Sequence, residues 1–139
     1  MTTTNSQNRE VYLFQKSVAP GESGRLSQEI PANGILEKLT VRFYVGAELN
    51  LEIEPSIIRL GNMRDHLVRY TGLTSLKGDD DKFIFNLSTP VYYQEELEVF
   101  YENTLDPEEY GEEYSYNFVV IFEIDHIGKP YEETIGGGS

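Results

Sequence analysis

Three consecutive carboxylates are the strongest metal-binding candidate in this sequence. Asp79, Asp80 and Asp81 follow Gly78 in a short polar stretch. Ca²⁺ takes six to eight oxygen ligands, which carboxylates and loop carbonyls can supply. The spacing is not that of an EF-hand, because no twelve-residue loop closed by a glutamate follows. A run of acids also forms solvated turns without metal, so calcium at Asp79, Asp80 and Asp81 is one of two interpretations.

The histidines do not form a recognisable catalytic pair. His66 follows Asp65 and His126 follows Asp125, and adjacent residues of a strand point to opposite faces. There is no Gly-x-Ser-x-Gly motif and no His-x-His or His-x-x-x-His spacing. The absence of cysteine excludes thiol nucleophiles, disulfides and Cys-based zinc sites. We therefore predict a protein that is not an enzyme and needs no cofactor, with calcium as the one exception considered.

Tyrosines provide an alternative binding chemistry. The rings of Tyr92, Tyr93 and Tyr110 could stack against a sugar, as in a carbohydrate-binding or adhesive β-sandwich. Tryptophan, which such platforms use more often, is absent. Tyrosines in strands also serve as ordinary core and rim residues. Carbohydrate binding, with calcium as a stabilising ion, is therefore the alternative function.

Charge is unevenly distributed along the chain. Residues 95–113 contain nine acids and no base, whereas residues 56–78 contain four bases and a histidine against one acid. The two segments could neutralise each other within one molecule. Alternatively, the basic segment of one subunit could bind the acidic loop of another, which would build rings or arrays. The predicted interface residues of these segments are Arg59, Arg64, His66, Arg69, Glu108, Glu109, Glu112 and Glu113.

Composition restricts the class of protein and its partners. With 139 residues, 39% of them hydrophobic and 12% aromatic, the chain is long enough for one globular domain with a substantial core. The net charge of −13 argues against nucleic acid and anionic lipid as partners. No apolar run is long enough to cross a bilayer, and the first ten residues lack the features of a signal peptide.

The clearest structural pattern is an alternation between Ile35 and Pro55. Leu39, Val41, Phe43 and Val45 share one parity, and Leu49, Leu51 and Ile53 resume it after Gly46-Ala47-Glu48. Such a pattern with a short glycine-containing link predicts a β-hairpin. The expected register places Arg42 opposite Glu52 and Thr40 opposite Glu54 on the solvent face.

Further strands are expected on both sides of this segment. We predict two short strands near 57–60 and 66–71, with strand ends at Pro55 and near Pro90. The last strand, within 114–125, is apolar on both faces, which predicts a central strand or an outer face covered by another subunit. Val119 and Ile121 are therefore added to the predicted interface.

About eight short strands and no confident helix predict an all-β protein, an antiparallel β-sandwich. A jelly roll is preferred over an immunoglobulin-like Greek key. We expect residues 1–8 to be a flexible N-terminal tail, 9–130 a single β-sandwich domain and 131–139 a flexible C-terminal tail. The final Gly-Gly-Gly-Ser resembles an engineered linker.

One stretch resembles a known group of proteins. VAPGESGRLSQEIPANGILEKLTVRFYVGAELNLEIEP, residues 18–55, resembles the opening of small β-sandwich proteins carried on phage and other virus particles. The resemblance implies a virion accessory role, such as capsid decoration or head or tail attachment. It also implies location in the virion and assembly through protein partners, both as a homo-oligomer and on a capsid or tail lattice. No functional residue follows from it.

Overall fold

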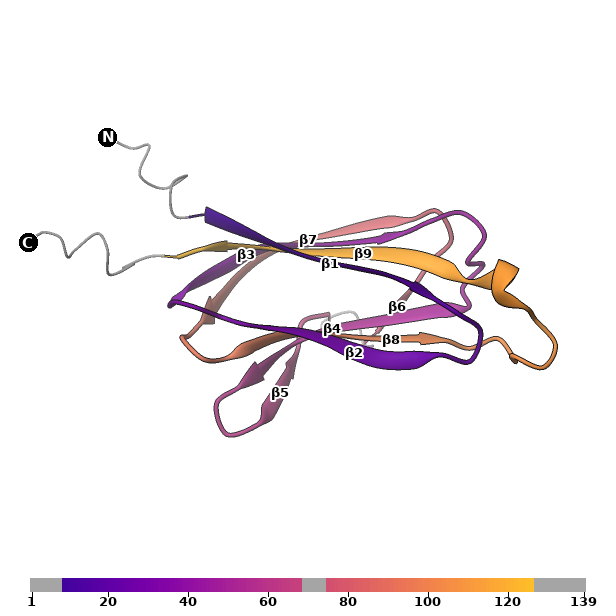
Figure 1. Ribbon diagram of the computed structural model, residues 1–139. Helices are drawn as coiled ribbons and strands as arrows, with labels where there is room; N and C mark the ends of the chain where they lie inside the picture. Colours follow the sequence, from indigo (N-terminus) through magenta and orange to yellow (C-terminus); the bar gives the residue numbers. More distant parts are fainter. Residues whose placement is uncertain (1–8, 69–74, 127–139) are drawn as a thin grey trace, which may run out of the picture.

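The computed structural model describes residues 9–68 and 75–126, which form two antiparallel sheets packed face to face (Figure 1). Sheet A has the strand order β1 (Arg9–Val18), β9 (Tyr116–Asp125), β3 (Gly34–Phe43) and β7 (Lys82–Val91). Sheet B has the order β2 (Ser23–Glu29), β8 (Glu96–Asn103), β4 (Leu51–Arg59) and β5 (Met63–His66), and β6 (Leu76–Lys77) also pairs with β4. A single 3₁₀ turn, η2 (Glu112–Tyr114), precedes β9 in the described part.

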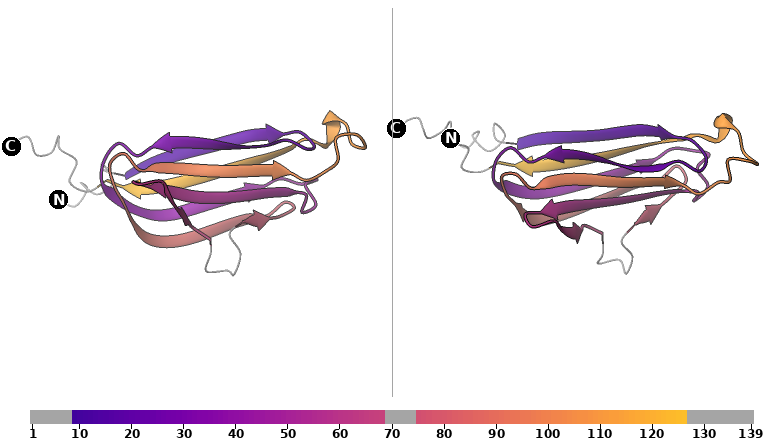
Figure 2. Two further views of the ribbon diagram at one scale, coloured as in Figure 1. Left: turned by 90° about the horizontal axis from the view of Figure 1, so that it is seen from below. Right: turned by 60° about the horizontal axis from the view of Figure 1, so that its bottom comes forward.

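The predicted all-β antiparallel sandwich is confirmed. Its chain passes from one sheet to the other at nearly every connection, and only β4, β5 and β6 are successive strands of the same sheet (Figure 2). An immunoglobulin-like order would keep further successive strands together as hairpins. The observed alternation therefore favours the connectivity of a jelly roll. The predicted tails at 1–8 and 131–139, as well as Arg69, lie outside the described residues.

The predicted hairpin between Ile35 and Pro55 is wrong. β3 pairs with β7 and β9 in sheet A, whereas β4 pairs with β5, β6 and β8 in sheet B. The residues between them form a crossover loop, with a left-handed backbone at Gly46 (φ 104°) and Leu49 (φ 69°). Val45 and Leu49 are therefore exposed, at 77% and 58%, instead of extending the buried faces.

The alternation nevertheless identified the buried faces correctly. Leu39, Val41 and Phe43 of β3 and Leu51 and Ile53 of β4 are fully buried. Period-two patterning shows which face of a strand is apolar, but two such faces can meet across a sandwich as well as side by side. In this protein they meet across the sandwich.

Two prolines lie inside strands instead of ending them. Pro55 is the fifth residue of β4, and its carbonyl accepts a hydrogen bond from the Leu67 amide on the side away from β8. The nitrogen and the carbonyl of one residue point to the same side of a strand, so the proline nitrogen, which has no N–H, also points away from β8. On that side the neighbour of β4 changes from β6 to β5 at this position, so no strand hydrogen bond is lost. Pro90 lies in β7, an edge strand of sheet A, where proline is tolerated.

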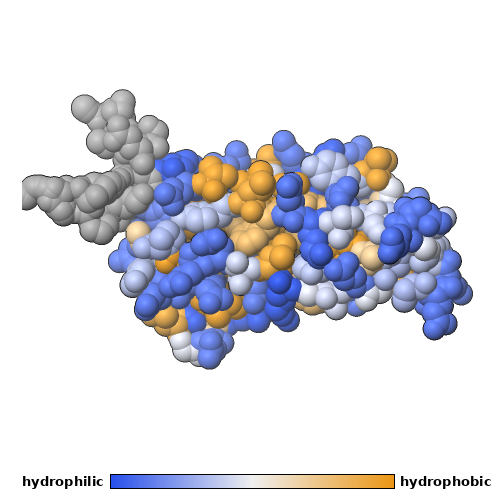
Figure 3. Space-filling model, viewed as in Figure 1, coloured by the Kyte–Doolittle hydropathy of each residue, from blue (hydrophilic) through white to orange (hydrophobic). Residues whose placement is uncertain are grey.

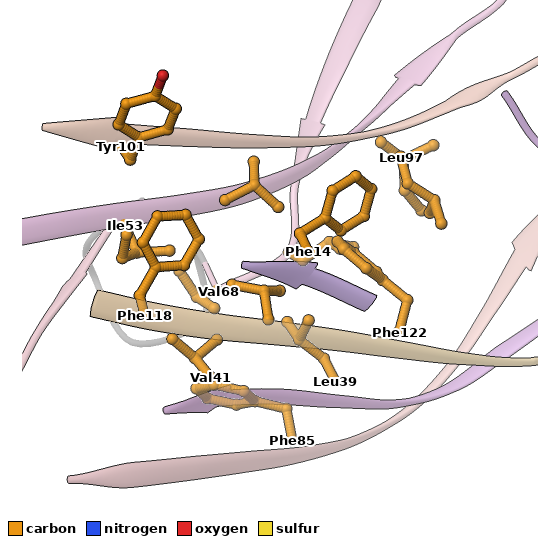
Figure 4. Packing of buried hydrophobic residues seen from close by; sticks show 14 of the residues in the cluster. Phe14, Leu39, Val41, Ile53, Val68, Phe85, Leu97, Tyr101, Phe118 and Phe122 are labelled. Atoms are coloured by element: carbon orange, nitrogen blue, oxygen red, sulfur yellow. The ribbon is translucent and has the colours of Figure 1, made fainter. Parts of the chain in front are cut away.

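One continuous core fills the space between the sheets (Figure 4). β9 supplies Phe118, Val120, Phe122 and Ile124, all fully buried, and lies between β1 and β3 as expected for a central strand. Aromatic pairs connect neighbouring strands, including Phe14 with Phe122, whose ring centroids are 5.6 Å apart. The inner face of sheet A is thereby buried in the core, and its outer face is turned away from sheet B.

Candidate functional site

An apolar row crosses the outer face of sheet A. The strand register places Leu13, Ile121, Thr40 and Ile84 side by side across all four strands. Leu13 is 56% exposed and Ile84 47% exposed, at the two edges, while Ile121 and the nearly buried Thr40 lie between them. We call these four residues the apolar row. Figure 3 shows apolar side chains in orange over this upper layer of the molecule.

Two further apolar residues widen the row along the strands. Val11, two residues before Leu13 on β1, is 59% exposed. Val119, two residues before Ile121 on β9, is half-buried on the same face and lies on the other side of the row. Beyond Val119 lies an open depression of about 450 Å³, whose rim includes Gln15, Asn117 and Tyr44. The face thus combines an apolar centre with polar groups beside it, an arrangement typical of protein interfaces.

The sequence predicted part of this face. Val119 and Ile121, taken as interface residues from the two-sided apolarity of the last strand, both lie on it. Leu13 and Ile84 were missed, because their neighbours in the row come from strands distant in sequence. Four consecutive apolar residues, Val11 to Phe14, were the available signal, since a strand with one solvated face should alternate.

Charge distinguishes the outer faces of the two sheets. Sheet A presents four bases (Arg9, Lys38, Arg42, Lys82) beside three acids (Glu37, Glu123, Asp125). On sheet B, six glutamates stand against Arg25, Arg64, Lys77 and His66, as the cross-strand pairs place Glu29, Glu52, Glu54, Glu96, Glu98 and Glu102. Among the described residues, charges therefore nearly balance on the outer face of sheet A, whereas the outer face of sheet B is acidic.

The predicted basic segment has partners within the molecule. Arg59 donates to Glu95 at 2.7 Å and to Asp65 at 3.0 Å, and its pKa is raised because these hydrogen bonds outweigh the lowering effect of burial. Arg64 is hydrogen-bonded to Glu98, which Arg25 also contacts. Glu95 and Glu98 belong to the start of the acidic run, so part of the charge asymmetry is neutralised within one chain.

His66 lies beside this cluster. Its Nδ1 is 2.7 Å from a carboxylate oxygen of Glu54, without the alignment of a hydrogen bond, so the contact is an ion pair when the ring is protonated. The remaining predicted acids, Glu108, Glu109, Glu112 and Glu113, are exposed in the loop between β8 and β9. This loop follows Asn103, the last residue of β8, whereas Arg59 lies beside Glu96, the first residue of β8. The loop therefore does not neighbour Arg59.

The three aspartates of the proposed calcium turn already have contacts within the protein. Asp79 accepts a hydrogen bond from the Gly46 amide at 2.8 Å, Asp80 forms an ion pair with Arg42 at 2.9 Å, and Asp81 accepts from the Asp79 amide. Within the described residues, no three acidic or histidine side chains are grouped to hold a metal. Calcium binding at this turn stays a prediction.

The tyrosines of the carbohydrate hypothesis lie in two places. Tyr92 and Tyr93 are 50% and 56% exposed in the β7–β8 connection, before β8 begins. Tyr110 lies after β8 has ended and packs against Tyr114 with ring centroids 5.0 Å apart. Tyr110 is thus separated from Tyr92 and Tyr93 by the full length of β8. A sugar-binding platform in the β7–β8 connection would therefore consist of Tyr92 and Tyr93 alone.

The second histidine belongs to a buried network. His126 is fully buried, and its Nδ1 lies 2.9 Å from the carbonyl oxygen of Ala32, so this nitrogen carries a proton. Its Nε2 is 2.7 Å from the oxygen of the Tyr12 hydroxyl, and this hydroxyl donates its hydrogen to Glu10 at 2.6 Å. Burial, followed by the hydrogen bond and the charge of Glu10, raises the pKa of Tyr12. The network ties β1 to the end of β9 and the β2–β3 connection.

Comparisons with known proteins give only weak likenesses. No protein-family model and no curated protein matches the chain. A crystal structure of PirA has a TM-score of 0.44 at 13% identity, over 81% of this chain and 93% of that one. The Aeromonas hydrophila periplasmic inhibitor of g-type lysozyme, PliG, has a TM-score of 0.42 at 11% identity, over 85% and 89%.

A third likeness is to a viral chain. A chain of infectious bursal disease virus, Gt strain, has a TM-score of 0.38 at 16% identity, and the match covers 87% of this chain but only 33% of the viral one. At these TM-scores and identities, the likenesses carry no argument about activity or partners. Separately, no helix in residues 9–68 and 75–126 has the length and apolar composition needed to cross a membrane.

Proposed function

We propose that this protein is a non-enzymatic interaction module that binds protein through the outer face of sheet A. The observation that carries the proposal is the apolar row, which leaves Leu13 and Ile84 half exposed on the outer face of a four-stranded sheet. A sheet face that is to remain in water usually carries polar residues at such positions. The two histidines support the non-enzymatic part, since each is engaged by groups of the fold.

The biological setting we propose is a virus particle, as an accessory protein of the capsid or tail. This part rests on the resemblance of residues 18–55 to small β-sandwich virion proteins. It implies that the protein stays with particles through direct protein contacts, without a cofactor.

Sedimentation of particles from the source on a density gradient tests both parts. We expect the wild-type protein in the particle fraction, and we expect Leu13→Glu to move it to the soluble fraction. Ser27→Glu is the matched control, because Ser27 is exposed on the outer face of an edge strand of sheet B. A wild-type protein absent from the particle fraction would reject the virion setting. Equal retention of both variants would reject the binding face.

Carbohydrate binding is the second candidate, because Tyr92 and Tyr93 are exposed next to each other in one connection. A glycan array probed with the wild type and with Tyr92→Ala/Tyr93→Ala tests it. Binding that the double variant loses would support the alternative, and an array without any binding would remove it.

A further inference from the structure

The outer face of sheet A has a charge pattern that can complement itself. Lys38 on β3 and Glu123 on β9 are cross-strand neighbours close to the apolar row. Glu123 forms an ion pair with Arg9, with 3.3 Å between the charged atoms. Within the described residues, Lys38 has no ion-pair partner. A base and an acid on adjacent central strands can each meet the opposite charge when the face is turned onto itself.

We infer that the outer face of sheet A binds a second copy of the same chain, about a two-fold axis that runs between β9 and β3 and parallel to them. The inference rests on the proposed function and names its partner. In this arrangement β9 of each copy lies over β3 of the other, and β1 lies over β7. Two sheets packed in this way are nearly aligned, as in the interior of a β-sandwich.

The apolar row fits this arrangement. Leu13 of one copy lies against Ile84 of the other, and Ile121 lies against Thr40, with each contact occurring twice. The two most exposed residues of the row are thereby covered at both edges. Burial of such side chains is the main favourable term in association.

Charge selects this axis over the other simple choice. With the axis along the strands, Lys38 of each copy lies over Glu123 of the other. With the axis across the strands at the apolar row, Arg42 would lie over Lys38, and like charges would meet. The six glutamates on the outer face of sheet B remain far from the contact, so the net charge of −13 does not prevent association through sheet A.

The area of the face is sufficient for a specific contact. Its four strands of ten residues, about 4.8 Å apart and rising about 3.4 Å per residue, offer roughly 650 Å² per copy. Two copies would bury roughly 1,300 Å², within the range of specific protein interfaces.

Charge exchange between two variants tests the inference by sedimentation equilibrium. Lys38→Glu alone places two glutamates opposite each other in the dimer, and Glu123→Lys alone places two lysines. We expect each variant alone to dimerise at least about tenfold more weakly than the wild type. Mixed in equal amounts, they should form a heterodimer, because both contacts between the copies then join opposite charges.

The mixture separates contacts between copies from contacts within one chain. Inside each variant the pair 38–123 stays like-charged, so recovery in the mixture requires the contact between copies. Thermal unfolding of each variant checks that it is folded. Leu13→Glu is a second way to disrupt the face, because it places a charge in the apolar row. A wild type that is monomeric at every concentration, or a mixture as weak as its components, would overturn the inference. If Leu13→Glu still abolished particle binding in that case, the proposed function would stand with a different partner.

Discussion

Arg59 on β4 donates a hydrogen bond to the carboxylate of Glu95, 2.7 Å away in the connection between the two sheets. Glu95 is only 5% exposed and also accepts from the Tyr92 amide. The same guanidinium donates to the Pro90 carbonyl at 2.9 Å. This pair therefore connects sheet B to the end of β7 in sheet A, at the same end of the sandwich as Tyr92 and Tyr93.

Replacing Glu95 by alanine should lower the free energy of unfolding by about 2–3 kcal/mol. The partly buried guanidinium of Arg59 would lose one partner while keeping Asp65 and the Pro90 carbonyl. Urea denaturation measures the change. Glu96→Ala, at the neighbouring exposed position, is the control and should stay within about 0.5 kcal/mol of the wild type. Equal losses for both variants would show that the pair has no special role.

Phe43 tests the core assigned from the sequence pattern. Its ring is fully buried and meets Phe83 edge to face, with ring centroids 6.0 Å apart. Phe43→Ala should cost about 3–5 kcal/mol because it leaves a cavity that the sheets cannot close. Val45→Ala, at a position 77% exposed, is the comparison and should have little effect on thermal unfolding. A Phe43→Ala protein as stable as its parent that no longer binds its partner would mean the two faces are reversed.

Tyr12 should make stability fall at high pH. Its pKa is raised in the folded state, mainly by burial, so the unfolded chain releases this proton at a lower pH than the folded protein does. Stability is fully present below about pH 10, the ordinary tyrosine value, and declines above it, by at most about 1.4 kcal/mol per pH unit for one group.

Denaturation from pH 8 to pH 11 measures this decline. Tyr12→Phe should have a shallower slope above pH 10, and Tyr93→Phe, which removes an exposed phenol, should retain the wild-type slope. Some slope should persist in Tyr12→Phe, because burial also raises the pKa of Tyr116. An unchanged slope in Tyr12→Phe would contradict the role assigned to the buried network.

Calcium gives a direct test of Asp79, Asp80 and Asp81. A site there predicts that excess calcium raises Tm, since a ligand that binds only the folded state stabilises it. Asp80→Asn should remove the rise, although it also weakens the ion pair with Arg42. A wild-type Tm that does not respond to calcium would remove the metal from consideration and leave the turn to its protein contacts.

The sequence was sufficient for the class of fold and for the buried faces of several strands. Alternation correctly marks Leu39 and Val41, as well as Leu51 and Ile53, as core residues. It could not show that β3 and β4 belong to different sheets, because parity carries no information about neighbours in the sheet. The crossover depends on the left-handed backbone around Gly46 and Leu49, and a leucine in the sequence does not predict that conformation.

The candidate site was predictable only where one strand reveals it. Val119 and Ile121 are recognisable because β9 is apolar on both faces. The apolar row as a whole depends on the pairing of β1 with β9, and of β3 with β7 and β9, and these partners lie far apart in the sequence. Likewise, the partners of Arg59 and Arg64 depend on the position of β4 and β5 beside β8.

Cysteine crosslinking tests the binding face most directly, because the sequence contains no cysteine. Each variant carries a single cysteine, so a link between positions 13 and 84 joins two chains. Stacked sheets lie about 10 Å apart, beyond the reach of a disulfide, so the crosslinker is a bismaleimide that spans about 10 Å between two thiols. Treating a mixture of Leu13→Cys and Ile84→Cys with it should give a dimer linked between residues 13 and 84, while Ser27→Cys treated alone should stay largely monomeric. No 13–84 product, or equally rapid crosslinking of Ser27→Cys, would contradict the account.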